Sequence, residues 1–321
     1  MGGLVRRSFL ALAAAFAAGP VLALTKAEWA AIGQYGDKAA PLTLYEKDGA
    51  LFVDGAGLLA ARLTPTGGGR YAISGGGELA LEKSAVRLNG TVLAFHDFGA
   101  ETQAGIHKAV RADPAALRRR ALAATPPVET QEHLPADLVD LTTVDPRIKL
   151  DIRYAGSDNF MGIPLYERAA AYLQRPAAEA LGRAQKALAE KGYGLLIHDA
   201  YRPWFVTWMF WEATPPEDHA FVADPAKGSR HNRGCAVDLT LYDLKTGKPV
   251  EMPSRYDEFS PRAYADFVGG ATRQRAFRAL LREAMTAQGF EVYPEEWWHF
   301  DYKDWRRYGI GTRSFTQLAG G

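Results

Sequence analysis

The most constraining feature of this chain is an acidic residue inside an alternating apolar run. Residues 236–242 read Ala-Val-Asp-Leu-Thr-Leu-Tyr, and this alternation predicts a β-strand whose successive side chains point to opposite faces. Val237, Leu239 and Leu241 share the core face. Asp238 therefore lies on the opposite face, with small and polar neighbours. A carboxylate beside a core is costly unless it is paired or bound to a metal, so this face is either solvated or part of a polar site.

Two histidines provide candidate metal partners for this carboxylate. His231 precedes the strand in "SRHNRGCAVD", and His299 ends the motif "EEWWH". His, His and Asp with one open position form a donor set typical of catalytic zinc. Glu296 could take a proton from an attacking water, and Arg202 in "DAYRP" could bind the oxyanion that forms at a carbonyl. Each motif alone also fits a structural role, and a solvated strand face remains the alternative interpretation of Asp238.

Composition and cysteine content exclude several classes of protein. Lys and Arg number 38 against 37 Asp and Glu, and these charges are interspersed, so a nucleic-acid partner is not expected. Beyond the N-terminus no apolar run is long enough to span a bilayer. Cys235 is the only cysteine, which rules out an internal disulfide. It shares strand parity with Val237, and this predicts a buried side chain.

Residues 1–23 have the pattern of an export signal. Arg6 and Arg7 precede an uncharged stretch, and Val21 and Ala23 would occupy the −3 and −1 positions of a cleavage site. The arginine pair also resembles a twin-arginine signal, which exports folded proteins, although an ordinary secretory signal can carry the same pair. We therefore expect an exported, periplasmic protein with no stable membrane span after signal removal.

The remaining chain divides into three parts. Residues 24–100 contain short alternating runs separated by Asp-Gly, Asn-Gly and Gly-rich turns, which predict a small all-β domain of unknown role. Residues 101–135 predict a helix and a Pro-containing linker. From 136 to 313 helical and strand patterns alternate, which predicts an α+β catalytic domain. In that domain a long helix is expected to end at Gly192, before a buried strand at 193–198.

Taken in order, these motifs resemble the zinc D-alanyl-D-alanine dipeptidases, which are related to DD-carboxypeptidases and to the hedgehog signalling domain. The resemblance runs from about residue 138 to 305 and includes "DIRYAGSDNFMGIPLY", "GYGLLIHDAYRP", "SRHNRGCAVDLTLYDLKTG", "PSRYDEF" and "GFEVYPEEWWHF". The spacing S-x-H-x6-D followed by E-W-W-H is specific to this family. The resemblance implies a hedgehog-like catalytic fold, in which an antiparallel sheet carries the metal ligands and helices pack against it.

The resemblance also implies the roles of the chemical groups. It implies one Zn²⁺ per catalytic domain, held by His231, Asp238 and His299. Glu296 matches the general base that later protonates the leaving amine. Arg202 matches the group that polarises the scissile carbonyl.

Other positions match the substrate pocket of the family. Asp257 in "SRYDEF" matches the acidic anchor for the free ammonium of a dipeptide, and Ser229 and Tyr154 match further pocket positions. Asp199 could orient Arg202 or cap the helix that follows.

Two features depart from the family pattern. The connection from Arg202 to His231 is shorter than in the dipeptidases, which predicts a reduced wall around the pocket. The family's typical members also lack the β-rich segment that precedes the catalytic domain here.

The sequence predicts zinc-dependent hydrolysis of D-Ala-D-Ala or a similar D-containing dipeptide. One alternative is a DD- or LD-carboxypeptidase that acts on peptidoglycan stem peptides, in which case peptidoglycan fragments are the partners. A second alternative is a non-catalytic, zinc-stabilised module that binds cell wall. The presence of Glu296 and Arg202 argues against that module, because a structural zinc needs neither group.

Overall fold

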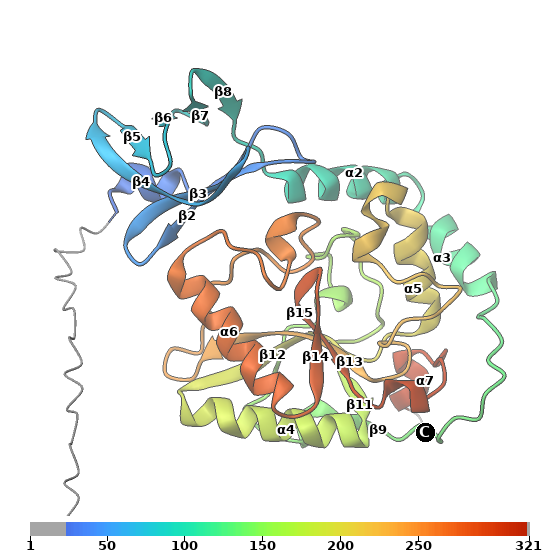
Figure 1. The fold of residues 1–321 in the computed structure, drawn as a ribbon. Helices are drawn as coiled ribbons and strands as arrows, with labels where there is room; N and C mark the ends of the chain where they lie inside the picture. Colours follow the sequence, from blue (N-terminus) through green and yellow to red (C-terminus); the bar gives the residue numbers. More distant parts are fainter. Residues whose placement is uncertain (1–23, 320–321) are drawn as a thin grey trace, which may run out of the picture.

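The computed structural model describes residues 24–319, and the expected export signal at 1–23 lies outside them. Figure 1 shows a β-rich unit at the upper left, joined by two helices to a larger mixed α/β body. Among the described residues no helix combines the length and apolar character that crossing a bilayer requires.

The first unit, which we call the β domain (residues 24–97), is an antiparallel sheet of eight strands in sequence order. Its elements are α1 (Lys26–Ala30), β1 (Gly33–Tyr35), β2 (Leu42–Lys47), β3 (Ala50–Gly55), β4 (Leu58–Gly67), β5 (Arg70–Ile73), β6 (Glu78–Glu82), β7 (Ala85–Leu88) and β8 (Thr91–Ala94). The sheet closes on itself, because Gly36 N donates to Ala94 O and His96 N donates to Gln34 O. Closure removes the exposed edges that an open sheet would present.

Two helices connect the β domain to the rest of the chain: α2 (Phe98–Ala112) and α3 (Pro114–Ala123). The sequence predicted a single helix within 101–135, so α2 is a correction, and it begins before the expected domain boundary at 100. Its start is explained by local chemistry, since Asp97 accepts a hydrogen bond from Ala100 N as an N-cap. Asp113 caps α3 in the same way, with Pro114 at the first helical position.

The catalytic domain is built around a five-stranded sheet in the order β10-β12-β13-β15-β14. Its elements are β9 (Leu138–Asp140), β10 (Lys149–Leu150), β11 (Tyr172–Gln174), α4 (Arg175–Glu190), β12 (Tyr193–Asp199), α5 (Trp204–Ala213), the 3₁₀ helix η3 (Pro216–Phe221), β13 (Ala236–Asp243), α6 (Thr272–Thr286), β14 (Phe290–Tyr293), β15 (Glu296–Tyr302) and α7 (Phe315–Ala319). The domain is thus mixed α+β, but the sheet is not wholly antiparallel, because β10 and β12 run parallel. Helices α4 and α6 pack against this sheet (Figure 1).

The hydrophobic core explains why these elements stay together. Val237, Leu239 and Leu241 on β13 are fully buried in it, as their alternation predicts, and Cys235 is buried with them. Phe315 of α7 is also fully buried and lies 4.4 Å from Tyr166, measured between ring centroids. The core therefore extends beyond residue 313, where the sequence suggested that the catalytic domain ends.

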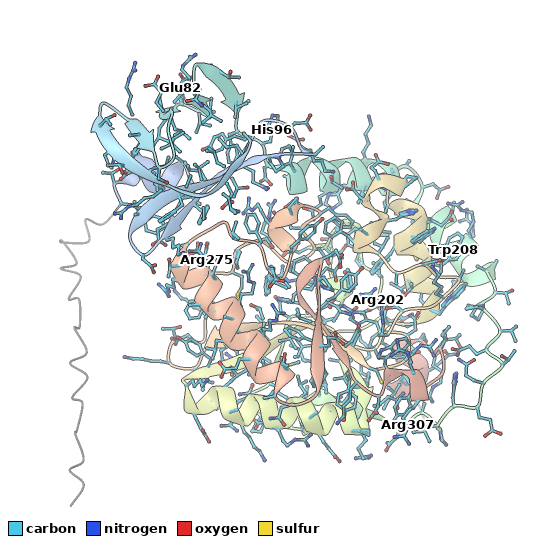
Figure 2. The ribbon with its side chains drawn as sticks, viewed as in Figure 1. Glu82, His96, Arg202, Trp208, Arg275 and Arg307 are labelled. Atoms are coloured by element: carbon cyan, nitrogen blue, oxygen red, sulfur yellow. The ribbon has the colours of Figure 1, made fainter. Side chains whose placement is uncertain are left out.

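The β domain contacts the catalytic domain at the start of α6. Glu46 Oε2 accepts a hydrogen bond from Thr272 N at 2.6 Å, so a carboxylate from one domain meets the N-terminus of a helix in the other. Arg275 Nη2 donates to Glu46 O at 2.5 Å, and Figure 2 shows Arg275 at this junction. Tyr45 and Gly270 add a backbone bridge.

Candidate active site and metal centre

Strand register brings three polar side chains into one row across the central sheet. Asp238 on β13 pairs with His299 on β15 and with Asp199 on β12. The ladder between β12 and β13 shifts after Ile197, and without this bulge His198 would stand opposite Asp238. The bulge therefore places Asp199, rather than His198, in the row.

His231 reaches the same point from the loop before β13. Arg202 N donates to His231 O at 3.1 Å, and Asn232 Nδ2 donates to Arg202 O at 2.8 Å. Gly234 has a φ of 65°, a left-handed conformation that glycine adopts without steric cost, and it turns the chain into the strand. These bonds fix the histidine loop against the segment that carries Arg202.

The three candidate ligand atoms form a nearly equilateral triangle. His231 Nε2 lies 3.1 Å from His299 Nδ1 and 3.3 Å from Asp238 Oδ1. His299 Nδ1 lies 3.0 Å from the same Asp238 oxygen. Tetrahedral ligands at zinc bond lengths of about 2.0–2.1 Å would lie about 3.3 Å apart, so the spacing fits zinc. All three residues are buried, and together they form a group that could hold a metal ion.

In each histidine, the ring nitrogen that is not part of the triangle already has a hydrogen-bond partner. His231 Nδ1 lies 2.6 Å from Ala200 O and donates a hydrogen bond to it. The other ring nitrogen, Nε2, therefore keeps a free electron pair that can bind a cation. His299 Nε2 lies 2.9 Å from Asp301 Oδ1. Burial opposes ionisation of Asp238, yet the two imidazoles hold its pKa well below the ordinary value. The triangle therefore presents an ionised carboxylate and two oriented imidazoles.

Sequence reasoning missed two residues that support these ligands. Asp301 lies two positions after His299 on β15, so both side chains emerge on one face, and this i, i+2 relation was readable. The Tyr256 hydroxyl donates to Asp238 Oδ2 at 2.9 Å. It lies next to Asp257 in "SRYDEF", but no local pattern signals a contact with a strand 18 residues earlier.

Arg202 is held in place by Asp199. Arg202 Nε and Nη2 donate to Asp199 Oδ2 at 2.9 and 2.8 Å, and Tyr166 donates to the other carboxylate oxygen at 2.7 Å. The guanidinium carbon lies 4.5 Å from the ring centroid of Phe210. Asp199 thus orients Arg202, whereas the alternative of a helix cap is not observed, since α5 follows Pro203 without a side-chain cap.

Glu296 stands at the start of β15, beside the candidate ligands. Its Oε2 lies 3.7 Å from His299 Nδ1, and its side chain is 15% exposed. Burial raises the pKa of Glu296 to about 8, against the opposing effect of His299. A carboxyl that titrates near neutral pH can accept a proton and return it. A cation bound by His299 would lower this pKa, because it favours the ionised form.

Asp257 has an unusual backbone and a free acceptor atom. Its φ is 58°, a left-handed conformation that is strained for a residue with a Cβ. Oδ1 accepts from the Tyr154 hydroxyl at 2.8 Å, while Oδ2 is buried and has no partner among the described residues. Burial raises the pKa of Asp257 to about 8. Ser229 lies nearby on the cavity lining, and its Oγ accepts from His231 N at 3.1 Å.

One cavity of about 70 Å³ brings these groups together inside the catalytic domain, where Figure 2 shows Arg202. Every residue proposed from the sequence lines it: Tyr154, Arg202, Ser229, His231, Asp238, Asp257, Glu296 and His299. The connection from Arg202 to His231 supplies residues 220–223 to the lining. This connection, expected to leave a reduced wall, therefore does border the cavity.

Comparison with known protein families matches the region of the chain that contains this cavity. A family model described as D-ala-D-ala dipeptidase matches residues 135–309, which is more than half of the chain. The chain belongs to this family. Membership makes it a metallopeptidase, and the match leaves the β domain, α2 and α3 outside the family region.

Individual relatives have the same extent of similarity. The D-alanyl-D-alanine dipeptidase of Escherichia coli (strain K12) is 34% identical over 180 residues, which cover 56% of this chain and 92% of that protein. The D-alanyl-D-alanine dipeptidase of Enterococcus faecium is 35% identical over 178 residues, covering 49% of this chain and 87% of that protein. A solved structure of the LdcB LD-carboxypeptidase matches with a TM-score of 0.30 and 17% identity, covering 57% of this chain and 72% of that one.

Proposed function

We propose that this protein is a zinc-dependent dipeptidase that hydrolyses D-Ala-D-Ala, or a similar D-containing dipeptide, to free amino acids. The observation that carries the proposal is Asp257 Oδ2, which has no hydrogen-bond partner among residues 24–319 and lies in one cavity with His231, Asp238 and His299. A small dipeptide has a free ammonium group, and a buried carboxylate oxygen is a suitable acceptor for it.

Each group near the triangle has a definable task. Zinc held by the three ligands would supply Lewis acidity to the carbonyl and favour ionisation of water. Glu296 takes the proton from the attacking water and delivers it to the leaving amine, so that the amide bond is exchanged for a carboxylate and an ammonium. Arg202, fixed by Asp199, donates to the carbonyl oxygen as negative charge develops there.

Asp257 also separates the proposal from its main alternative. A carboxypeptidase acting on a peptidoglycan stem would place an acylated nitrogen, which carries no charge, where the dipeptide has its ammonium. A buried carboxylate would then face a neutral amide, which is a weaker partner than an ammonium. A non-catalytic cell-wall-binding module would have no use for the oriented Arg202 or for Glu296.

Export of the protein is part of the same proposal. We propose that the signal at 1–23 sends the protein to the periplasm, where cell-wall dipeptides and peptidoglycan fragments are available. Mass spectrometry of the mature protein tests export: a retained Met1 on active, periplasmic protein would contradict signal cleavage.

Alanine release from purified protein tests the activity. The substrates are D-Ala-D-Ala, L-Ala-L-Ala and a stem peptide that ends in D-Ala-D-Ala. We expect rapid release from the first only. Faster release of terminal alanine from the stem peptide would favour the carboxypeptidase, and no release from any substrate by zinc-loaded protein would favour the binding module.

A further inference from the structure

A buried carboxylate of the catalytic domain takes its side-chain partners from outside the family region. Asp218, in η3, is only 5% exposed. Lys38 Nζ lies 3.1 Å from its Oδ1, and the Thr102 hydroxyl lies 3.4 Å from its Oδ2. Lys38 also donates to Thr102 at 3.1 Å. Lys38 lies between β1 and β2, and Thr102 lies in α2, so both precede the matched residues 135–309.

The segment that carries Asp218 continues directly into the wall of the active site. Residues 220–223, from the end of η3 onward, line the cavity that contains the candidate ligands His231, Asp238 and His299. Phe221 packs against Phe259, another lining residue, with ring centroids 5.3 Å apart. A displacement of Asp218 would therefore be transmitted within three residues to the surface that faces the substrate.

The start of α2 contacts a second segment of the pocket lining, residues 255–259. Arg255 Nη2 lies 3.4 Å from Asp97, the N-cap of α2. A methyl group added at Gly99 would overlap the side chain of Glu258. Glu258 lines the active-site cavity and directly follows Asp257. The same appended segment thus packs behind the proposed ammonium anchor.

We propose that residues 24–113 hold the substrate pocket in place, and we call them the brace. Lys38 is the positioning residue: through Asp218 it fixes residues 216–223, the segment that leads into the cavity wall. The brace sets the length of peptide that the site accepts. This inference rests on the proposed dipeptidase function, and it assigns the β domain and α2 a task in substrate selection rather than in binding a separate partner.

The physical reason is the cost of an unpaired buried charge. Without the Lys38 ammonium, the Asp218 carboxylate would remain in a largely dry position, with Thr102 as its one remaining side-chain partner among the residues that the structure describes. The Asp218 side chain would then move toward water, and residues 220–223, which follow it in the chain, would be displaced as well. Because Lys38 is itself 45% exposed in its side chain, solvent screens the pair, and the effect should be smaller than for a fully buried pair.

The test measures substrate length preference rather than activity alone. Full-length Lys38→Met is compared with wild type for kcat/KM on D-Ala-D-Ala and on tri-D-alanine, which is one residue too long in either binding direction. We expect the dipeptide-to-tripeptide ratio to fall roughly tenfold in Lys38→Met and to be restored in Lys38→Arg. Thr102→Val, a conservative change, should shift the ratio in the same direction by a smaller factor.

Lys83→Met is the matched control. Lys83 is exposed and follows Glu82, which lies at the end of the β domain away from the catalytic domain (Figure 2). It should leave the ratio unchanged. A general loss of stability would lower both rates together, whereas loosening of the wall changes their ratio. An unchanged ratio in both Lys38→Met and Thr102→Val would overturn the brace.

Hydrogen exchange separates this inference from the proposed function. Amides at 216–223 should exchange faster in Lys38→Met than in wild type or Lys83→Met, whatever substrate the enzyme uses. Wild-type protein that leaves D-Ala-D-Ala intact would refute the dipeptidase proposal alone. Unchanged exchange at 216–223 in Lys38→Met would refute the brace alone.

Discussion

The two largest sheets among residues 24–319 bury their residues differently. In the β domain, strands such as β5 alternate between exposed and buried positions, so one face meets the small core and the other meets solvent. In the catalytic domain, the first seven of the eight residues of β13 are all buried. Its core face packs against apolar residues, and its other face, with Asp238, lies beneath the loops that close the active site.

Buried polar side chains also differ between the β domain and the catalytic domain. In the catalytic domain they concentrate around the cavity and are mutually bonded, as Asp199, Arg202, Asp238 and His299 illustrate. The β domain buries few polar side chains, and one of them, Glu46, bonds to the catalytic domain at Thr272. A sheet with one wet face can remain stable without polar networks, whereas a sheet covered on both faces retains charges only where partners compensate them.

The comparison predicts that metal affects one region and leaves the other intact. Chelation should abolish hydrolysis, because three buried ligands lose the cation between them, and zinc should restore it. Exchange of amides in β13 and β15 should rise, while that in β5 and β6 stays unchanged. Full activity in protein shown by elemental analysis to contain no divalent metal would contradict the metal site.

The next largest effect is expected at Glu296. Glu296→Gln keeps the shape of the side chain but removes the proton acceptor. We expect turnover to fall by about 10²–10⁴-fold, with zinc content and unfolding temperature close to wild type. Zinc lost in parallel with activity would instead assign Glu296 a structural role.

Arg202 should have a smaller effect on turnover and a larger effect on stability. Arg202→Ala should lower kcat by about 10²–10³-fold, as for a missing oxyanion donor, with metal retained. It also leaves Asp199 as an uncompensated buried carboxylate, which should reduce stability. Arg202→Ala/Asp199→Asn separates the two effects: stability should recover and kcat should not.

The candidate metal ligands could be picked out from the sequence because their chemistry is unusual for their position, whereas Asp257, Ser229 and Tyr154 were implied only by the family resemblance. Asp238 in an apolar strand and His299 after two tryptophans are informative even without a structure. The helix ending before Gly192 and the strand that follows were likewise local patterns, and the structure has α4 and β12 there. Which residues serve the catalytic roles stays a prediction that the variants above address.

What the sequence could not provide depends on contacts between distant segments. The bulge that places Asp199 opposite Asp238 arises from pairing between β12 and β13, and neither strand alone specifies it. The hydrogen bond from Tyr256 to Asp238 could not be predicted from the sequence either, because it depends on how the loop that carries Tyr256 folds back onto β13. The role of Lys38 is a contact across 180 residues, so a lysine in a turn looked like any other exposed charge.

Asp257 offers a sharper test through pH. Burial raises its pKa to about 8, so below that pH the carboxyl is largely neutral and pairs weakly with an ammonium. The kcat/KM ratio of D-Ala-D-Ala to N-acetyl-D-Ala-D-Ala should therefore rise between pH 6 and 8. It should fall again as the substrate amine, with a pKa of about 8, loses its proton. Taking the ratio cancels titrations that affect both substrates equally.

At its maximum the free dipeptide should be favoured by at least about 30-fold, and Asp257→Asn should erase most of that preference and its pH dependence. Equal cleavage of the acetylated substrate by wild type would show that Asp257 does not bind an ammonium. The carboxypeptidase alternative would then be the better account.

The smallest effect on activity is expected from a matched pair of core substitutions, one in each sheet. Leu79 in β6 and Leu239 in β13 are both fully buried, so each Leu→Ala change should destabilise its own domain by about 2–5 kcal/mol. Leu239 neighbours Asp238, and a shift of that strand should lower kcat/KM about tenfold or more. Leu79→Ala lies in the alternating sheet and should change kcat/KM by less than about twofold where the protein remains folded. Hydrogen exchange shows which domain is loosened. Equal loss of activity in the two variants would mean that the β domain is coupled to catalysis through its whole core. A brace that acts only through the contacts at Lys38, Asp97 and Gly99 predicts that the two variants differ.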